Sequence, residues 1–77
     1  MDIQIDSAFL QSLREGDLVA RRLADGRSFM TLKVTTVTPN HIICGDWMFL
    51  KRTGGEIDDE LGWDGYVTGS FITRPTQ

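Results

Sequence analysis

The chain holds one histidine and one cysteine, two residue types that often pair in nucleophilic catalysis. His41 and Cys44 lie three positions apart in a segment that we predict to be a strand. Side chains alternate between the two faces of a strand, so residues three apart point to opposite faces. The two cannot act together as a nucleophile and its base, and we expect no catalytic residues and no enzyme activity. Because a lone cysteine is usually buried, Cys44 is predicted to be a small core residue.

Five carboxylates are concentrated between Glu56 and Asp64, a stretch without Lys or Arg. Such oxygen ligands can hold Ca²⁺ or Mg²⁺, but their order here lacks the alternation and the closing Glu of an EF-hand loop. We favour a solvated loop, whose charge keeps a sheet edge from pairing with other chains. The sequence therefore predicts no metal ion and no other cofactor.

Trp63 lies inside this acidic stretch, between Gly62 and Asp64, where strand packing does not demand a large aromatic side chain. One interpretation is an anchor for a basic protein partner, with the carboxylates steering its approach. The other is a side chain that folds back and covers one end of the domain. The predicted partner-binding residues are Asp58, Asp59, Glu60, Trp63 and Asp64.

Cations next to aromatic residues offer a different chemistry, because stacking and positive charge together suit single-stranded nucleic acids. Against this, a small domain needs its large aromatics for burial, so Trp47 and Phe49 are predicted core residues. The chain also carries a formal net charge of −3, whereas nucleic-acid-binding domains usually have a basic surface. RNA or DNA binding is therefore the alternative function, and its candidate residues are Arg21, Arg22, Lys51 and Arg52.

Short runs rich in β-branched and aromatic residues are separated by turn pairs, and this rhythm predicts a small all-β domain. The turn pairs are Asp25-Gly26, Pro39-Asn40, Gly45-Asp46 and Gly54-Gly55. Two-residue loops at Asp25-Gly26 and Gly45-Asp46 fix the register of the first and second hairpins. They place Val19 opposite Leu32, Arg21 opposite Met30, Ile42 opposite Phe49, and Cys44 opposite Trp47.

The remaining elements lie at the two ends of the chain and at one bend. Asp6 or Ser7 is predicted to cap a short helix that runs through Arg14 and stops at Gly16. The apolar positions change phase between Val34 and Val37, which predicts a bulge or sharp bend. Residues 66–73 are predicted to form the closing strand, and residues 74–77 a frayed tail.

With 77 residues, the chain is expected to form a single domain over positions 1–77. It has no apolar run long enough to span a membrane, and its N-terminus lacks the basic flank and apolar core of a secretory signal. One cysteine cannot form an intrachain disulfide, which suits a reducing compartment. We therefore expect a cytoplasmic protein.

The hairpin residues resemble those of SH3-like barrels, and more narrowly those of small barrel proteins from phages and bacteria. The motifs that carry the resemblance are G-D-L-V at 16–19, V-T-T-V-T at 34–38, the isoleucines at 42 and 43, and F-L-K-R-T-G at 49–54. They cover residues 16–57 and specify a fold more than an activity. The resemblance implies an SH3-like barrel of five or six strands with a short N-terminal helical turn.

The acidic stretch and Trp63 predict a non-catalytic protein-binding module. If the chain comes from a phage, as the resemblance implies, an accessory or host-inhibitory role would suit such a small acidic protein. A more distant likeness to KOW-type modules implies association with RNA. The chain departs from that pattern because it lacks a Gly-rich basic loop after the first strand and adds an acidic stretch. Protein binding through the acidic stretch is therefore the expected function.

Overall fold

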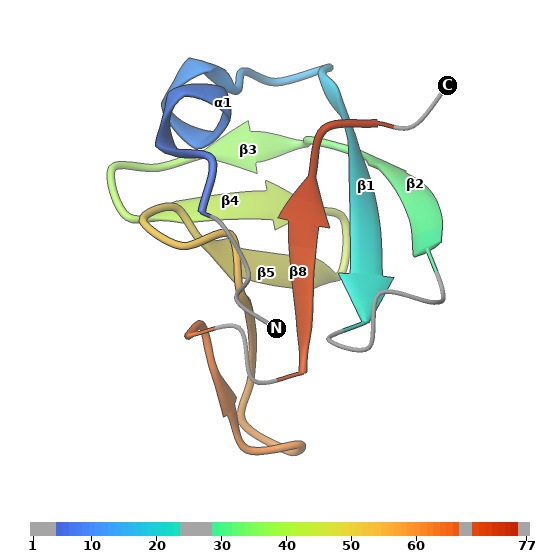
Figure 1. Cartoon of the computed structure of the whole chain (residues 1–77), viewed down its shortest axis with the longest axis vertical. Helices are drawn as coiled ribbons and strands as arrows, with labels where there is room; N and C mark the ends of the chain where they lie inside the picture. Colours follow the sequence, from blue (N-terminus) through green and yellow to red (C-terminus); the bar gives the residue numbers. More distant parts are fainter. Residues whose placement is uncertain (1–4, 24–28, 67–68, 76–77) are drawn as a thin grey trace.

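The chain folds into two antiparallel sheets and one short helix, as the sequence predicts for the all-β class. A computed structural model describes residues 5–23, 29–66 and 69–75. One sheet has the strand order β2-β1-β8 and the other the order β3-β4-β5-β6-β7 (Figure 1). The elements are α1 (Ser7–Ser12), β1 (Leu18–Leu23), β2 (Phe29–Lys33), β3 (Thr36–Val37), β4 (His41–Cys44), β5 (Trp47–Leu50), β6 (Glu56–Asp58), β7 (Trp63–Asp64) and β8 (Ser70–Thr73).

The helix begins where the sequence predicts and ends earlier. Asp6 is the N-cap, and its carboxylate accepts a hydrogen bond from the backbone N–H of Phe9 at 3.1 Å. The backbone becomes extended at Leu13, so the predicted end at Arg14 with a stop at Gly16 is wrong. Gly16 instead lies in the following turn with a φ of 94°, where its N–H donates to the carbonyl of Val34 at 2.8 Å. One turn of helix is enough because Phe9 and Leu10 are buried in the core.

The predicted register of the first hairpin is confirmed, with Val19 opposite Leu32 and Arg21 opposite Met30. The predicted turn at Asp25-Gly26 lies outside the described residues. The predicted bend is also confirmed: β2 ends at Lys33 in one sheet and β3 begins at Thr36 in the other. Buried Val34 and the β3 residue Val37 both pack on the core, although the residues between them are exposed. The chain thus changes sheets without a long connection.

The hairpin of β4 and β5 has the predicted register throughout, and its inner face supplies much of the core. Ile42 and Phe49 face each other across the two strands, and neither is exposed to solvent. Cys44 is also buried, as predicted, while its partner Trp47 is half-buried against the same cluster. The core cluster consists of Phe9, Leu10, Leu13, Val19, Leu32, Val34, Ile42, Cys44, Phe49 and Ile72.

The last strand, β8, links the two sheets. It pairs with β1, and an isolated bridge joins Phe71 to Gly55 beside the other sheet. The N–H of Ile72 also donates to the carbonyl of Gly54 at 2.9 Å. The strand begins at Ser70, so the predicted start at Tyr66 is wrong. Arg74, the first residue of the predicted frayed tail, forms an ion pair, and residues 76–77 lie outside the described residues.

Candidate functional site

The acidic stretch is a hairpin, not a loop. β6 pairs with β7, with Ile57 opposite Asp64 and Asp58 opposite Trp63. This β6–β7 hairpin, coloured orange, projects from one end of the body in Figure 1. Asp58 shapes its turn, since its Oδ1 accepts hydrogen bonds from the backbone N–H groups of Glu60 at 3.0 Å and Leu61 at 3.3 Å. The hairpin therefore presents Asp59 and Glu60 to solvent on a defined backbone.

Glu56 does not belong to the exposed acidic surface, contrary to the sequence prediction. Its side chain is 4% exposed, and its Oε1 lies 2.8 Å from Nε of Arg21 on β1. The hydroxyl of Ser70 on β8 donates to the same oxygen at 2.5 Å. The Arg21 guanidinium lies 5.8 Å from the centre of the Trp47 ring. A buried polar cluster thus joins β1, β6 and β8 where the acidic hairpin leaves the body.

A groove of about 450 Å³ lies beside this cluster, and we call it the acidic groove. Four of its carboxylates, on Asp46 and on residues 58–60, take part in no ion pair among the described residues. No Lys or Arg lines the groove in the part of the chain that the structure describes, while Trp47 and Met48 give it an apolar wall. The lining residues are Asp46, Trp47, Met48, Glu56, Ile57, Asp58, Asp59 and Glu60.

Trp63 is half-buried and lies against the chain just before β8. A Cβ atom added to Gly69 would lie 1.9 Å from Cε2 of the Trp63 ring, so the ring packs directly on the Gly69 backbone. Trp63 is thus neither fully exposed nor part of the core cluster. Asp64 is exposed and accepts the backbone N–H of Tyr66 at 3.0 Å. Neither Trp63 nor Asp64 lines the acidic groove.

The return segment of the hairpin partly covers the outer apolar face of β4 and β5. Gly65 has a φ of 93°, and a Cβ there would lie 2.9 Å from Cβ of Leu50 and 3.2 Å from Cγ1 of Ile57. Only a residue without a side chain can approach so closely. Met48, on the same face, remains 39% exposed.

The four candidate nucleic-acid residues do not share one surface. Arg21 is held by Glu56 in the buried cluster. Arg22 points to the other face of β1, and its Nε donates to the hydroxyl of Thr73 at 3.4 Å. Lys51 and Arg52 lie together in the turn after β5 and line a separate groove of about 370 Å³. Of the four residues predicted to bind RNA or DNA, only Lys51 and Arg52 therefore line the same groove.

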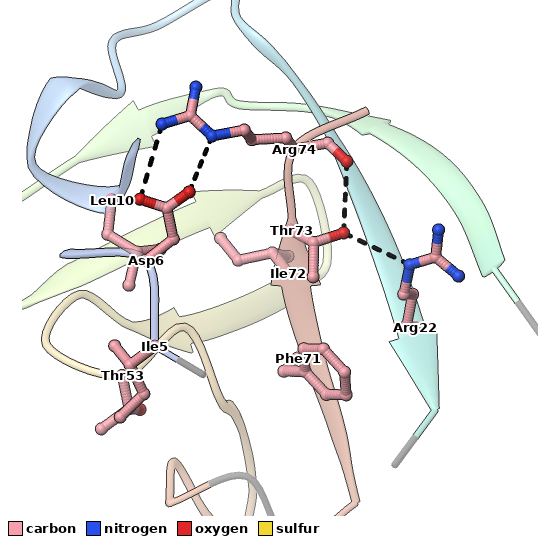
Figure 2. A pocket seen from close by; sticks show the side chains of 9 residues that line it. All are labelled: Ile5, Asp6, Leu10, Arg22, Thr53, Phe71, Ile72, Thr73 and Arg74. Carbon is pink, nitrogen blue, oxygen red and sulfur yellow. Dashed lines mark hydrogen bonds and ion pairs between the residues drawn. The ribbon is translucent and has the colours of Figure 1, made fainter. Parts of the chain in front are cut away.

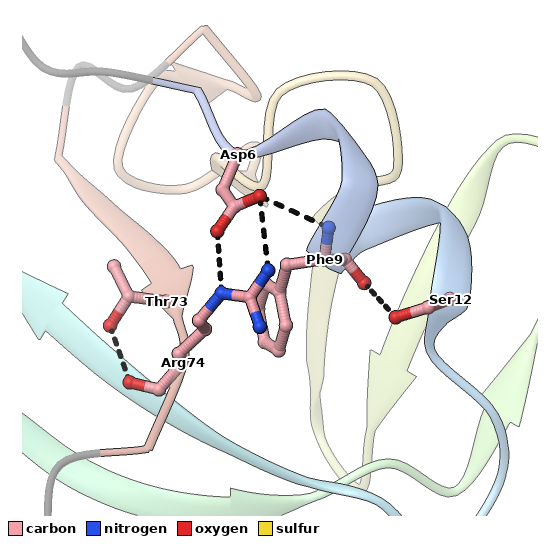
Figure 3. A network of polar contacts seen from close by, with 5 residues as sticks. All are labelled: Asp6, Phe9, Ser12, Thr73 and Arg74. Carbon is pink, nitrogen blue, oxygen red and sulfur yellow. Dashed lines mark hydrogen bonds and ion pairs between the residues drawn. The ribbon is translucent and has the colours of Figure 1, made fainter.

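A third groove, of about 730 Å³ and mixed polarity, lies between α1 and β8 (Figure 2). Figure 3 shows the ion pair at its rim, in which Nε of Arg74 lies 2.7 Å from Oδ2 of Asp6 while its guanidinium lies 5.3 Å from the centre of the Phe9 ring. The Arg74 hydrogen bond and the N–H of Phe9 hold the pKa of Asp6 below its ordinary value. The same hydrogen bond raises the pKa of Arg74. The lining residues are Ile5, Asp6, Leu10, Arg22, Thr53, Phe71, Ile72, Thr73 and Arg74.

Cys44 lies in an environment opposite to that of a reactive thiol. Burial raises its pKa to about 11, which suppresses the thiolate that acts as nucleophile or metal ligand.

The described residues contain no cluster of three or more His, Cys, Asp or Glu side chains able to hold a metal ion. Within the same residues, no helix has the length and apolarity needed to cross a bilayer.

The acidic groove includes residues that sequence reasoning missed. The sequence predicts only a turn at Gly45-Asp46 and assigns no binding role to Asp46 or Met48, yet both line this groove with Asp58. The signal available was the register of β4 and β5, which puts Asp46 in the tight turn beside Trp47. What the register could not supply was the pairing of Met48 with Ile57, which brings the acidic hairpin alongside β5.

Comparisons of the chain with protein-family models, with curated protein sequences and with solved structures give no match. The surfaces are therefore interpreted from their geometry and charge alone.

Proposed function

We propose that this chain is a small SH3-like barrel and a non-catalytic protein-binding module that binds a basic segment of another protein in its acidic groove. One observation carries the proposal: among the residues that the structure describes, four carboxylates without ion pairs line a groove that has an aromatic wall and no lining cation. Such a site steers a cationic partner by long-range attraction and holds it by contact with Trp47.

Two connections between the sheets support the barrel. At one edge the chain passes from β2 into β3 through the bend, and the N–H of Thr35 donates to the carbonyl of Ile43 at 2.8 Å. At the other edge the bridge between Gly55 and Phe71 places β8 beside the start of β6. Small β domains avoid exposed strand edges when their sheets close into a barrel, and these two connections support such a closure here.

The geometry also indicates the chemistry of the partner. A Lys or Arg side chain of the partner can make two kinds of contact in the groove. Its charged end pairs with the carboxylates, and its stem or guanidinium packs on the indole of Trp47. Leu61 at the hairpin tip is 58% exposed and offers an additional apolar contact next to Glu60. A module of this kind acts by occupying a basic surface of its partner, which fits an accessory or inhibitory role.

The test compares two double variants that remove the same charge. Asp59→Asn with Glu60→Gln removes two groove carboxylates that form no ion pair within the described residues, whereas Glu15→Gln with Asp17→Asn removes two that lie outside the groove. Binding of a short arginine-rich peptide is measured by calorimetry at low salt. We expect the groove variant to bind roughly 5-fold more weakly and the control variant to match wild type. Equal losses in both variants would refute the proposal, because attraction would then depend on net charge alone.

A further inference from the structure

A second groove, lined by Leu50 and Tyr66 among others, has the reverse charge. Lys51 and Arg52 line it without any carboxylate among its described lining residues, and we call it the basic groove. Neither cation takes part in an ion pair within the described part of the chain. The lining residues are Ser7, Gln11, Pro39, Asn40, Leu50, Lys51, Arg52 and Tyr66.

Tyr66 is the aromatic wall of the basic groove, and it is 58% exposed. An exposed tyrosine beside two cations is unusual for a side chain kept only for packing, because a buried site would use its apolar ring better. The amide side chains of Gln11 and Asn40 add hydrogen-bond donors and acceptors in the same groove. These groups match the parts of a nucleotide: a base face, a base edge and a phosphate.

The walls of the basic groove are held in place by backbone and buried hydrogen bonds. The N–H of Lys51 donates to the carbonyl of Asn40 at 2.9 Å, and the N–H of Gly54 donates to the carbonyl of Leu50 at 2.7 Å. The buried hydroxyl of Thr53 donates to the carbonyl of Gly65, the residue before Tyr66. The turn that carries the cations is thereby tied to the segment that carries the aromatic ring. Such a preorganised site loses little entropy when it binds a ligand.

We propose that the basic groove binds single-stranded nucleic acid, with one base stacked on Tyr66 and the adjoining phosphates on Lys51 and Arg52. A duplex does not fit this chemistry, because its bases are already stacked on one another and cannot reach the tyrosine. A volume of about 370 Å³ lies in the range of sites that take one small ligand unit. This site shares no lining residue with the acidic groove. An experiment that contradicts one of the two binding sites therefore leaves the other untouched.

The test is fluorescence anisotropy with short labelled oligouridylate and oligodeoxythymidylate at low ionic strength. We expect saturable binding whose affinity falls with salt at a logarithmic slope of about −1.4, the value for two phosphate contacts on a single strand. Tyr66→Ala should weaken binding ~10-fold, while Tyr66→Phe keeps the stacking face and binds within about 2-fold of wild type. Lys51→Gln with Arg52→Gln should abolish the salt dependence, whereas Arg14→Gln with Lys33→Gln, two exposed cations outside the groove, should retain it.

Each result decides the question. Binding of the RNA alone, the DNA alone or both identifies the natural strand and supports the site, whereas binding of neither overturns it. The site is also overturned if the control pair weakens binding as much as Lys51→Gln with Arg52→Gln, or if a polyglutamate peptide binds as tightly as the oligonucleotides. The ring protons of Tyr66 provide a readout on the unaltered protein, since stacking must shift them upfield in the NMR spectrum.

Discussion

Removing the guanidinium of Arg21 should destabilise the fold, because the buried carboxylate of Glu56 then loses its cation. The Arg21→Met variant keeps an unbranched side chain but leaves Glu56, with a side chain 4% exposed, bonded to the Ser70 hydroxyl alone. Breaking a buried ion pair by removing one partner costs about 3–5 kcal/mol, and the 18% exposure of Arg21 places this case near about 3 kcal/mol. For a domain of this size, that loss lowers the melting temperature by roughly 12–24 °C.

The assay is urea unfolding at neutral pH, followed by tryptophan fluorescence, on the wild type, Arg21→Met, Glu56→Gln and the double variant. Glu56→Gln keeps an acceptor for Ser70, so we expect the double variant to be more stable than the sum of the single losses implies. The coupling free energy should be at least ~1 kcal/mol, as expected for residues in direct contact. A loss below ~0.5 kcal/mol for Arg21→Met, or additive losses in the cycle, would refute the idea that this cluster joins the two sheets.

Four further predictions concern single residues. Phe49→Ala should lower the free energy of unfolding by ~3–5 kcal/mol in the same urea assay, because the ring is fully buried. The Cys44 thiol, with its pKa raised to about 11, should react with a disulfide reagent at pH 8 ~100-fold more slowly in the folded protein than in urea, and equal rates would contradict its burial. Asp6→Asn should be less stable than wild type at neutral pH; because the folded-state pKa of Asp6 is lowered, the gap should close as the pH falls below about 3.9 in acid-titration melts. Gly65→Ala should raise the unfolding rate in stopped-flow experiments and weaken ligand binding in the basic groove, since its Cβ collides with Leu50; an unchanged rate would show that the segment can shift freely.

Local patterns predicted the local structure of this chain. A two-residue turn fixes which residues face each other, and the pairs Val19–Leu32 and Cys44–Trp47 follow from counting outward. The change of phase between Val34 and Val37 marked the transfer from one sheet to the other, because a strand cannot keep both residues on one face without bending.

The candidate site was predicted less well, since its geometry depends on contacts between distant parts of the chain. Glu56 and Arg21 are 35 positions apart, and their pairing depends on β6 and β1 meeting across the interior. Nothing in the letters E-I-D-D-E distinguishes the buried first carboxylate from the exposed ones that follow. The position of Trp63 is equally non-local, because it requires a residue without a side chain at Gly69.

The acidic groove is tested most directly by an NMR titration of the labelled protein with an arginine-rich peptide. We predict that the backbone amides of residues 46–48 and 56–60 shift first and saturate together, while those of Lys51, Arg52 and Tyr66 stay unchanged. Shifts spread over the whole surface, or concentrated at residues 51–52 and 66, would contradict a binding site in the acidic groove.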